Sequence, residues 1–285
     1  MILGKRVFDD NQHLVMAIIN RTPDSFYDKG VSYTNSAALD RVEQVIEAGA
    51  DIIDIGGVKA GPGAQVDVAE EIRRTGDFVG LVRAGHPQVI ISVDTWRATV
   101  GRVALTEGAD VINDAWGGWD PDLAVVAGEF GAGLVCTHTG GATPRTRPHR
   151  VAYQDVVDDV LRSVTRQADR AVSLGVPADS IMIDPGHDFG KNTYHSLEVT
   201  RELGRLVDTG WPVLVSLSNK DFIGETLDRP VGERLIGTLA ATSVCAWLGA
   251  RVFRVHNVPE TVQTLNTVAA ITGTRPPTVA RRGLA

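Results

Sequence analysis

The sequence predicts a single (β/α)₈ barrel over residues 1–285, with its functional side chains at the carboxyl ends of the strands. Short apolar runs bounded by Gly, Asp or Asn recur along the chain, and most alternate with longer segments of helical periodicity. No Pro/Ser-rich linker or block of charge divides the 285 residues, and barrels of this length commonly form one domain. We therefore expect one barrel domain, followed by a flexible tail after about residue 274.

Eight apolar runs are expected to be the strands, and helical segments at 35–48, 153–174 and 232–248 to lie between them. The strands are expected at 13–20, 50–57, 89–95, 109–114, 133–138, 181–186, 212–218 and 250–256. An open doubly wound sheet fits the same alternation, but no strand is followed by the G-x-G-x-x-G turn typical of that fold. Closure into a barrel is the simpler interpretation.

Composition narrows the class of function. With 43% hydrophobic and 22% charged residues, the chain can bury a large core without disulfides or metal. A net charge of −7 gives no long-range attraction to nucleic acid or to an anionic membrane, so a small metabolite is the expected ligand. No apolar run has the length of a membrane span or a signal peptide, which favours the cytoplasm. Cys136 and Cys245 lie in apolar surroundings and are expected to be buried.

Polar residues gather where the expected strands end. Such residues are costly inside an apolar strand unless they emerge at its end. In a barrel the carboxyl ends form one rim where ligands bind, so we expect all of these side chains to face one mouth. Any single one is equally explained as a strand-end cap. They are Asn20, Asp54, Asp94, Thr95, Asn113, Asp114, His138, Asp184, Ser218, Lys220, Arg254 and His256.

The rim residues predict a heterocycle and an anion as ligand groups. Two carboxylates, an amide and an ammonium can pair with the edge of a flat nitrogen heterocycle. These are Asp94, Asn113, Asp184 and Lys220. Arg254 and His256 point to the same side of one strand and, with Asn20, can hold a phosphate-like group, although pairing with a rim acid is the alternative. No spacing typical of a zinc site or of a Ser-His-Asp triad is present.

At these residues the sequence resembles the dihydropteroate synthase family over almost its whole length. The segments that carry the resemblance occur in the order that the family shows. They are MAIINRTPDSFYDKG (16–30), GADIIDIGG (49–57), ISVDTWRATVGRVALTEGADVINDAWGG (91–118), MIDPGHDFGK (182–191), PVLVSLSNKDFIG (212–224) and GARVFRVHNV (249–258).

The resemblance implies a barrel that joins 6-hydroxymethyl-7,8-dihydropterin pyrophosphate to p-aminobenzoate with the help of Mg²⁺. By position, the pterin pocket would be lined by Asp94, Asn113, Asp184 and Lys220. The diphosphate would be met by Asn20, Arg254 and His256, with Asn20 also at the metal. The family generally forms homodimers through late helices. The apolar face of 235–248 suits that role, and it is equally explained by packing on the barrel.

The loops depart from the family pattern. After the second strand, the usual Glu-Ser-Thr-Arg-Pro-Gly is replaced by Val-Lys-Ala-Gly-Pro-Gly (58–63), so Ala60 and Gly61 stand for the Thr and the Arg. Lys59 restores charge but not the planar fork of donors that Arg provides. Asp221 stands where a small hydroxyl would help to hold the p-aminobenzoate carboxylate, and two carboxylates about 4 Å apart repel by roughly 1–4 kcal/mol.

The loop after the first strand is altered as well. Arg21 replaces a small apolar residue there, and Tyr27 and Lys29 stand where Ser and Gly are typical. The favoured hypothesis is therefore a pterin-site barrel with very weak or no synthase activity. One alternative is a working synthase in which Arg21, Lys29 and Lys59 replace the lost donors. Another is a related pterin-dependent transferase that uses a different acceptor.

Overall fold

Eight parallel strands form one sheet in the order β8-β7-β6-β5-β4-β3-β10-β9. A parallel bridge between Ile183 and Val213 joins β8 to β9 and closes the sheet into a barrel. The structure is a computed structural model that describes residues 1–22, 34–146 and 152–283. The strands are β3 (Leu14–Asn20), β4 (Ile52–Gly56), β5 (Ile90–Asp94), β6 (Val111–Asp114), β7 (Gly133–Thr137), β8 (Ile181–Asp184), β9 (Leu214–Val215) and β10 (Val252–Val255).

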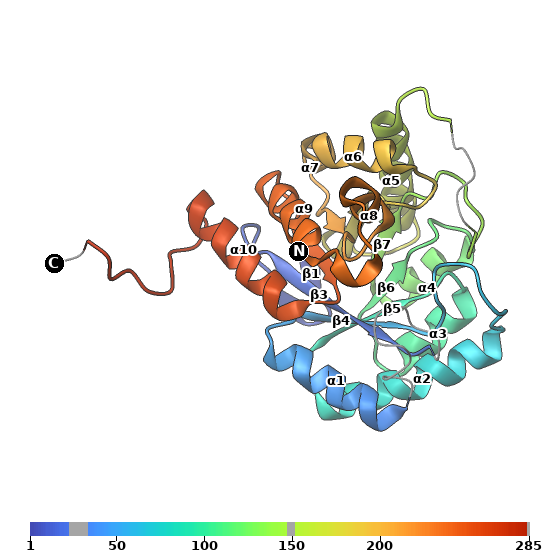
Figure 1. Ribbon diagram of the computed structural model, residues 1–285. Coiled ribbons are helices and arrows are strands. Elements are labelled where there is room, and N and C mark those ends of the chain that lie inside the picture. The colour runs from blue at the N-terminus through green and yellow to red at the C-terminus, as the bar shows by residue number, and fades with distance from the viewer. Residues whose placement is uncertain (23–33, 147–151, 284–285) are drawn as a thin grey trace.

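Helices follow the strands and cover the outside of the barrel (Figure 1). Two helices follow each of β8 and β9, and a single helix follows most of the other strands. Their bounds are α1 (Asn35–Glu47), α2 (Val68–Gly85), α3 (Ala98–Thr106), α4 (Asp122–Phe130), α5 (Val156–Ser173), α6 (Thr193–Arg201), α7 (Leu203–Val207), α8 (Asp221–Leu227), α9 (Leu235–Trp247) and α10 (Val258–Thr272). The predicted barrel is confirmed, and the three helices predicted by range begin and end within three residues of α1, α5 and α9.

Alternation along the strands separates two layers of core. One residue of a strand points into the barrel and the next points toward the helices. The inward residues at the amino ends of the strands form one apolar cluster, and the outward residues pack against the helices in a second, larger cluster. The inner cluster contains Leu14, Met16, Ile52, Ile90, Val111, Val135, Met182, Leu214 and Val252. The inward positions beyond it are therefore left for the polar groups of the mouth.

An amino-terminal hairpin, which no sequence pattern predicts, closes the floor of the barrel. Its strands, β1 (Ile2–Leu3) and β2 (Arg6–Val7), are antiparallel. Leu3 and the nearby Phe8 are buried in the inner cluster, so this segment seals the end of the barrel opposite the mouth. Strands of two residues give too short an alternation to be recognised from sequence.

The strand bounds differ from the expected ones mainly at the ends. The seventh strand was expected over 212–218, but β9 spans only Leu214–Val215. Pro212 has no N–H to donate, and only its carbonyl joins the sheet, accepting the N–H of Ile183 at 2.9 Å. After α10, residues 274–283 run away from the barrel (Figure 1). The flexibility expected of this tail stays a prediction. No helix within the described ranges is long and apolar enough to cross a membrane.

Candidate functional site

The polar residues of the mouth lie on the same alternating positions as the inner core. Two residues beyond Ile52 comes Asp54, four beyond Ile90 comes Asp94, and two beyond Val252 comes Arg254. Asn113 and Asp184 follow Val111 and Met182 in the same way. Five charged or polar side chains from five strands therefore converge above the apolar layer.

Arg254 links two carboxylates across the mouth. Its Nε donates to Asp54 Oδ2 at 2.6 Å, and its Nη2 donates to Asp94 Oδ2 at 2.8 Å. Asp54 is completely buried, and it also accepts hydrogen bonds from Ser92 Oγ at 2.6 Å and from Asn113 Nδ2 at 3.2 Å. Asp54 thus lies below the rim rather than at it, where it orients Arg254 and Asn113.

Burial raises the pKa of Asp94 to about 7, against an opposing effect of Arg254. The neighbouring carboxylate of Asp54 raises it further. Burial also raises the pKa of Asp184, and it lowers the pKa of Lys220. In each case the low-dielectric mouth disfavours the charged form, so a ligand that supplies complementary hydrogen bonds would regain part of that cost.

The expectation that all twelve polar residues face one mouth is wrong for three of them. Thr95 follows the inward Asp94 and therefore points outward, where its Oγ1 donates to Glu71 of α2 at 2.6 Å. Asp114 follows the inward Asn113, and its carboxylate accepts the N–H groups of Trp116 and Gly118 in the next turn.

The third exception is His138, which lies behind the mouth in a hydrogen-bonded chain. Its Nε2 lies 2.9 Å from Asp159 Oδ1 on α5, and its Nδ1 lies 2.6 Å from the Nζ of the buried Lys191. Lys191 also donates to the carbonyls of Gly186 and Phe189 at 3.0 and 3.1 Å. Since an ammonium has three donors, all of them are occupied. Burial lowers the pKa of Lys191 to about 7 and that of His138 to about 4.

Asp184 and Lys220 are placed by the loops that follow β8 and β9. Asp184 Oδ1 accepts the N–H of Gly186 at 2.7 Å, which fixes its orientation. Lys220 directly precedes α8, and its Nζ lies 4.5 Å from the centre of the Phe189 ring. Phe189 in turn packs edge-on against Trp116, with the ring centres 5.0 Å apart. An aromatic wall thus lies beside the ammonium group.

The three predicted diphosphate contacts lie on or directly after two neighbouring strands, β3 and β10. Arg254 turns to Asp54 and Asp94, as the alternative interpretation of a rim ion pair anticipated. His256 Nδ1 lies 2.9 Å from Ser218 Oγ. Asn20 ends β3, in register with Gly56.

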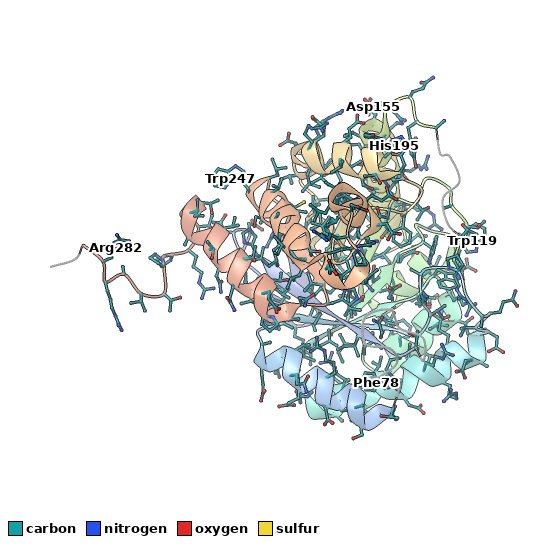
Figure 2. The ribbon with its side chains drawn as sticks, viewed as in Figure 1. Phe78, Trp119, Asp155, His195, Trp247 and Arg282 are labelled. Carbon is teal, nitrogen blue, oxygen red and sulfur yellow. The ribbon has the colours of Figure 1, made fainter. Side chains whose placement is uncertain are left out.

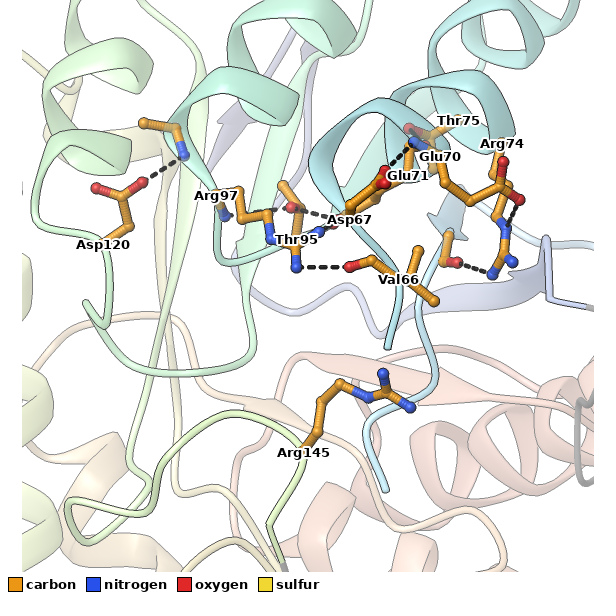
Figure 3. A network of polar contacts seen from close by, with 12 residues as sticks. Val66, Asp67, Glu70, Glu71, Arg74, Thr75, Thr95, Arg97, Asp120 and Arg145 are labelled. Atoms are coloured by element: carbon orange, nitrogen blue, oxygen red, sulfur yellow. Dashed lines mark hydrogen bonds and ion pairs between the residues drawn. The ribbon is translucent and has the colours of Figure 1, made fainter. Parts of the chain in front are cut away.

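Three arginines fix the loop between β4 and α2. Arg74 donates to Gly57 O at 2.9 Å, Arg97 to Val66 O at 2.8 Å, and Arg145 to Ala64 O at 2.5 Å. Figure 3 shows Arg74 and Arg97 on the helix side of this loop and Arg145 approaching from the loop after β7. Arg97 is itself held by the completely buried Glu71 at 2.6 Å.

Arg21 does not reach into the mouth. It is 5% exposed, and its guanidinium lies 4.4 Å from the centre of the Phe78 ring on α2. It donates to Thr34 O at 2.9 Å and to Asn35 Oδ1 at 2.5 Å at the start of α1. Its charge therefore serves the packing of α1 and α2. Tyr27 and Lys29, from the same expected loop, lie outside the described residues.

A second carboxylate, which no sequence motif indicates, lies at the start of α8. Asp188 accepts the N–H of Asp221 at 2.6 Å and that of Phe222 at 3.3 Å. Asp188 adopts a left-handed backbone conformation with φ of 67°, which residues other than glycine seldom adopt. Asp221 itself pairs with Arg234 at 2.9 Å. No periodicity in the sequence indicates such a contact between two loops.

The family model "Pterin binding enzyme" matches residues 16–256. A Mycobacterium leprae protein named "Inactive dihydropteroate synthase 2" is 57% identical over all of this chain and 99% of its own length. The solved structure of Yersinia pestis dihydropteroate synthase with a sulfonamide drug superposes with a TM-score of 0.90 at 32% identity, over 96% of this chain and 99% of that one. The structure of Mycobacterium tuberculosis Rv1207 gives a TM-score of 0.76 at 46% identity, covering 97% and 100% of the two chains.

The raised pKa of Asp94 predicts a specific pH dependence of stability. With a folded pKa of about 7 against an ordinary 3.8, the folded state binds this proton more tightly than the unfolded state between those values. Wild-type stability should therefore fall, relative to Asp94→Asn, as pH rises from about 4 to about 7, by at most about 1.4 kcal/mol per pH unit. Denaturant unfolding of both proteins at four pH values measures this, and parallel curves would contradict it.

Proposed function

The chain belongs to the pterin-binding enzyme family that includes the dihydropteroate synthases, and we propose that it is an inactive dihydropteroate synthase paralogue that keeps its pterin pocket. The observation that carries this proposal is the contrast between an intact set of polar groups on the strands and altered loops around them. The retained groups are Asp94, Asn113 and Asp184 on the strands and Lys220 directly before α8. The altered positions are Ala60 and Gly61 in the loop after β4 and Asp221 at the start of α8.

Pterin retention is supported by the chemistry of the inner face. Asp94 and Asp184 offer carboxylate oxygens, Asn113 an amide, and Lys220 an ammonium beside the ring of Phe189. Adjacent N–H donors of a flat heterocycle pair well with such acceptors, because buried carboxylates without donors are costly. Three of these four groups stand at strand positions that the barrel ladder fixes, and Lys220 stands directly before α8.

Loss of synthase activity is supported by the loops. Gly61 gives the loop after β4 no fork of donors to close over a diphosphate, and the three arginine contacts to its carbonyls hold the loop in one place. Arg21 cannot compensate, because it is buried against Phe78. Losing one preorganised transition-state donor can cost about 10²–10³ in rate. These loop features oppose the alternative of a fully working synthase.

The diphosphate and its metal remain part of the proposal through Asn20, Arg254 and His256. In the described part of the chain, no group of three or more His, Cys, Asp or Glu side chains is arranged to hold a metal ion. Mg²⁺ nevertheless often binds through one or two protein oxygens together with substrate phosphates, and the amide oxygen of Asn20 suits that arrangement. Such an ion would neutralise charge on the diphosphate, while Arg254 would have to share its donors with Asp54 and Asp94.

A second candidate function is a pterin-dependent transferase with another acceptor. Asp188 and Asp221 bring two carboxylates to the start of α8, where a benzoate-type acceptor would be repelled. A neutral or cationic amine meets no such opposition. A panel of amines tested with a dihydropterin pyrophosphate would reveal this activity.

We also propose a homodimer in the cytoplasm. The outer face of α9 carries Ile236, Val244 and Trp247, with 83%, 48% and 62% of each side chain exposed. Figure 2 shows Trp247 at the edge of the molecule. Contiguous apolar groups on a surface helix commonly mark an interface. Cys136 and Cys245 are buried and unpaired, as is usual in a reducing compartment.

The dimer is tested with Trp247→Asp. A charge at the carboxyl end of this apolar face should shift the protein toward monomer, because burying it is costly. Sedimentation at micromolar concentration measures the change. Tyr194→Asp, on α6 and 81% exposed, is the matched control and should sediment as wild type. A monomeric wild-type protein would contradict the proposal.

Pterin binding is tested by calorimetry with 6-hydroxymethylpterin. The wild-type protein should bind it, and Asp184→Asn should bind about tenfold more weakly or worse, because an amide unbalances the pairing with N–H donors. Asp179→Asn, a change at an exposed acid just before β8, should leave affinity unchanged. No heat from the wild-type protein at millimolar ligand would overturn the retained pocket.

Synthase activity is tested with both purified substrates and saturating Mg²⁺. The protein should form dihydropteroate far more slowly than a family member with the usual loops. The triple variant Ala60→Thr, Gly61→Arg and Asp221→Ser should raise kcat/KM for p-aminobenzoate at least tenfold, which is about 1.4 kcal/mol of transition-state stabilisation. The same variant with Gly61→Lys restores charge without the planar fork and should recover less. A fast parent enzyme, or an equally inactive triple variant, would show that other residues decide the rate.

A further inference from the structure

Thr137 is the last residue of β7 and faces the inside of the barrel. Val135, two residues earlier, belongs to the inner apolar cluster, whereas Leu134 and Cys136 pack outward against the helices. Thr137 lies directly beside Asp184 in the register of β7 and β8. On the other side, Asn113 pairs in register with Val135, one inward position below Thr137. Neighbouring strands are about 4.8 Å apart, so the hydroxyl stands between two of the polar groups of the mouth.

The hydroxyl of Thr137 has no hydrogen-bond partner within the described residues, although the side chain is 2% exposed. The backbone carbonyl of the same residue is satisfied, since it accepts from Gln167 Nε2 at 3.2 Å. Valine has the same shape and would fill this position without burying a polar atom. The fold alone therefore gives no reason for a hydroxyl at this point.

The other buried polar atoms without a partner in the described chain are different in kind. They are Arg145 Nε, His187 Nδ1 and Arg251 Nε. Each belongs to a side chain in which at least one other nitrogen atom is hydrogen-bonded: Arg145 to Ala64 O, His187 to Thr200 Oγ1, and Arg251 to Asp10. In Thr137 the single polar atom of the side chain is the one left over, and the side chain stands on the inner face of the barrel beside Asp184.

We propose that Thr137 is a ligand-contacting residue that completes the hydrogen-bonding edge formed by Asn113 and Asp184. The assignment rests on the proposed pterin site and deepens it. Asp184 has one oxygen held by the N–H of Gly186, and Asn113 donates to Asp54. The three neighbouring groups then offer a carboxylate oxygen, a hydroxyl that can donate or accept, and an amide. This order selects a heterocycle with polar atoms at adjacent ring positions. Asp184 would bind one of these atoms, and the Thr137 hydroxyl would hydrogen-bond to the atom next to it.

Thr137→Val tests this assignment through thermal stability and pterin affinity. A structural role predicts a loss of stability, whereas a ligand-contacting role predicts a loss of affinity. In the absence of ligand the variant should be at least as thermally stable as wild type, because it loses only an unsatisfied hydroxyl. It should bind 6-hydroxymethylpterin about three- to tenfold more weakly by calorimetry. Thr137→Ser keeps the hydroxyl and should restore affinity to within about twofold.

Thr95→Val is the matched control, because Thr95 is equally buried at the end of β5 but points outward and donates to Glu71. It should lower thermal stability and leave the affinity unchanged. A Thr137→Val variant that binds as tightly as wild type, or that loses stability as Thr95→Val does, would overturn the assignment while leaving the pterin site intact. A wild-type protein that gives no heat with the pterin would instead contradict the proposed function, and this assignment with it.

Discussion

The balance of charge between Arg254 and the two carboxylates of Asp54 and Asp94 is the interaction on which the mouth of the barrel depends. Asp54 is completely buried, and the loss of its partner would leave an uncompensated charge at a cost of about 3–5 kcal/mol. Ser92 and Asn113 bond to the same carboxylate, so the side chains of four strands are oriented around one point. A ligand that enters the mouth must either leave these hydrogen bonds in place or replace some of them with its own.

The fold and the inward residues of the mouth were predictable, because both follow from one alternation. Had the alternate positions been counted upward from Ile90, Asp94 would have been assigned to the inside and Thr95 to the helices; the same count separates Thr137 from His138. Grouping residues by strand end alone instead places outward groups such as Thr95 and His138 in the mouth. Arg21 and Asp188 were beyond such a count. Their roles depend on contacts between loops and helices, and the periodicity of apolar residues along the chain does not indicate such contacts.

The strand residues of the mouth match the pattern of the synthase family, whereas several residues outside the strands depart from it. Strand residues are held by ladder hydrogen bonds on both sides, and a change there disturbs the apolar layer below. Gly61 in the loop after β4 and Asp221 at the start of α8 lie outside the ladder, and their contacts are to other loop and helix residues. A binding floor can therefore persist after the loops that complete a reaction have changed. The mycobacterial relatives named inactive synthases are consistent with that course.

Lys191 and Lys220 give the site two amines of different chemical character. Lys191 is 2% exposed, and its Nζ is held by His138 and two carbonyls, so this amine is fixed in place and out of reach of a reagent in the mouth. Lys220 lies against an aromatic ring, a contact that leaves its N–H groups able to turn. An acylating or aldehyde reagent shaped to enter the mouth would therefore modify Lys220 and spare its buried neighbour. Lys191 therefore supports the wall of the pocket from behind, whereas Lys220 is the cation that can reorient toward a bound ligand.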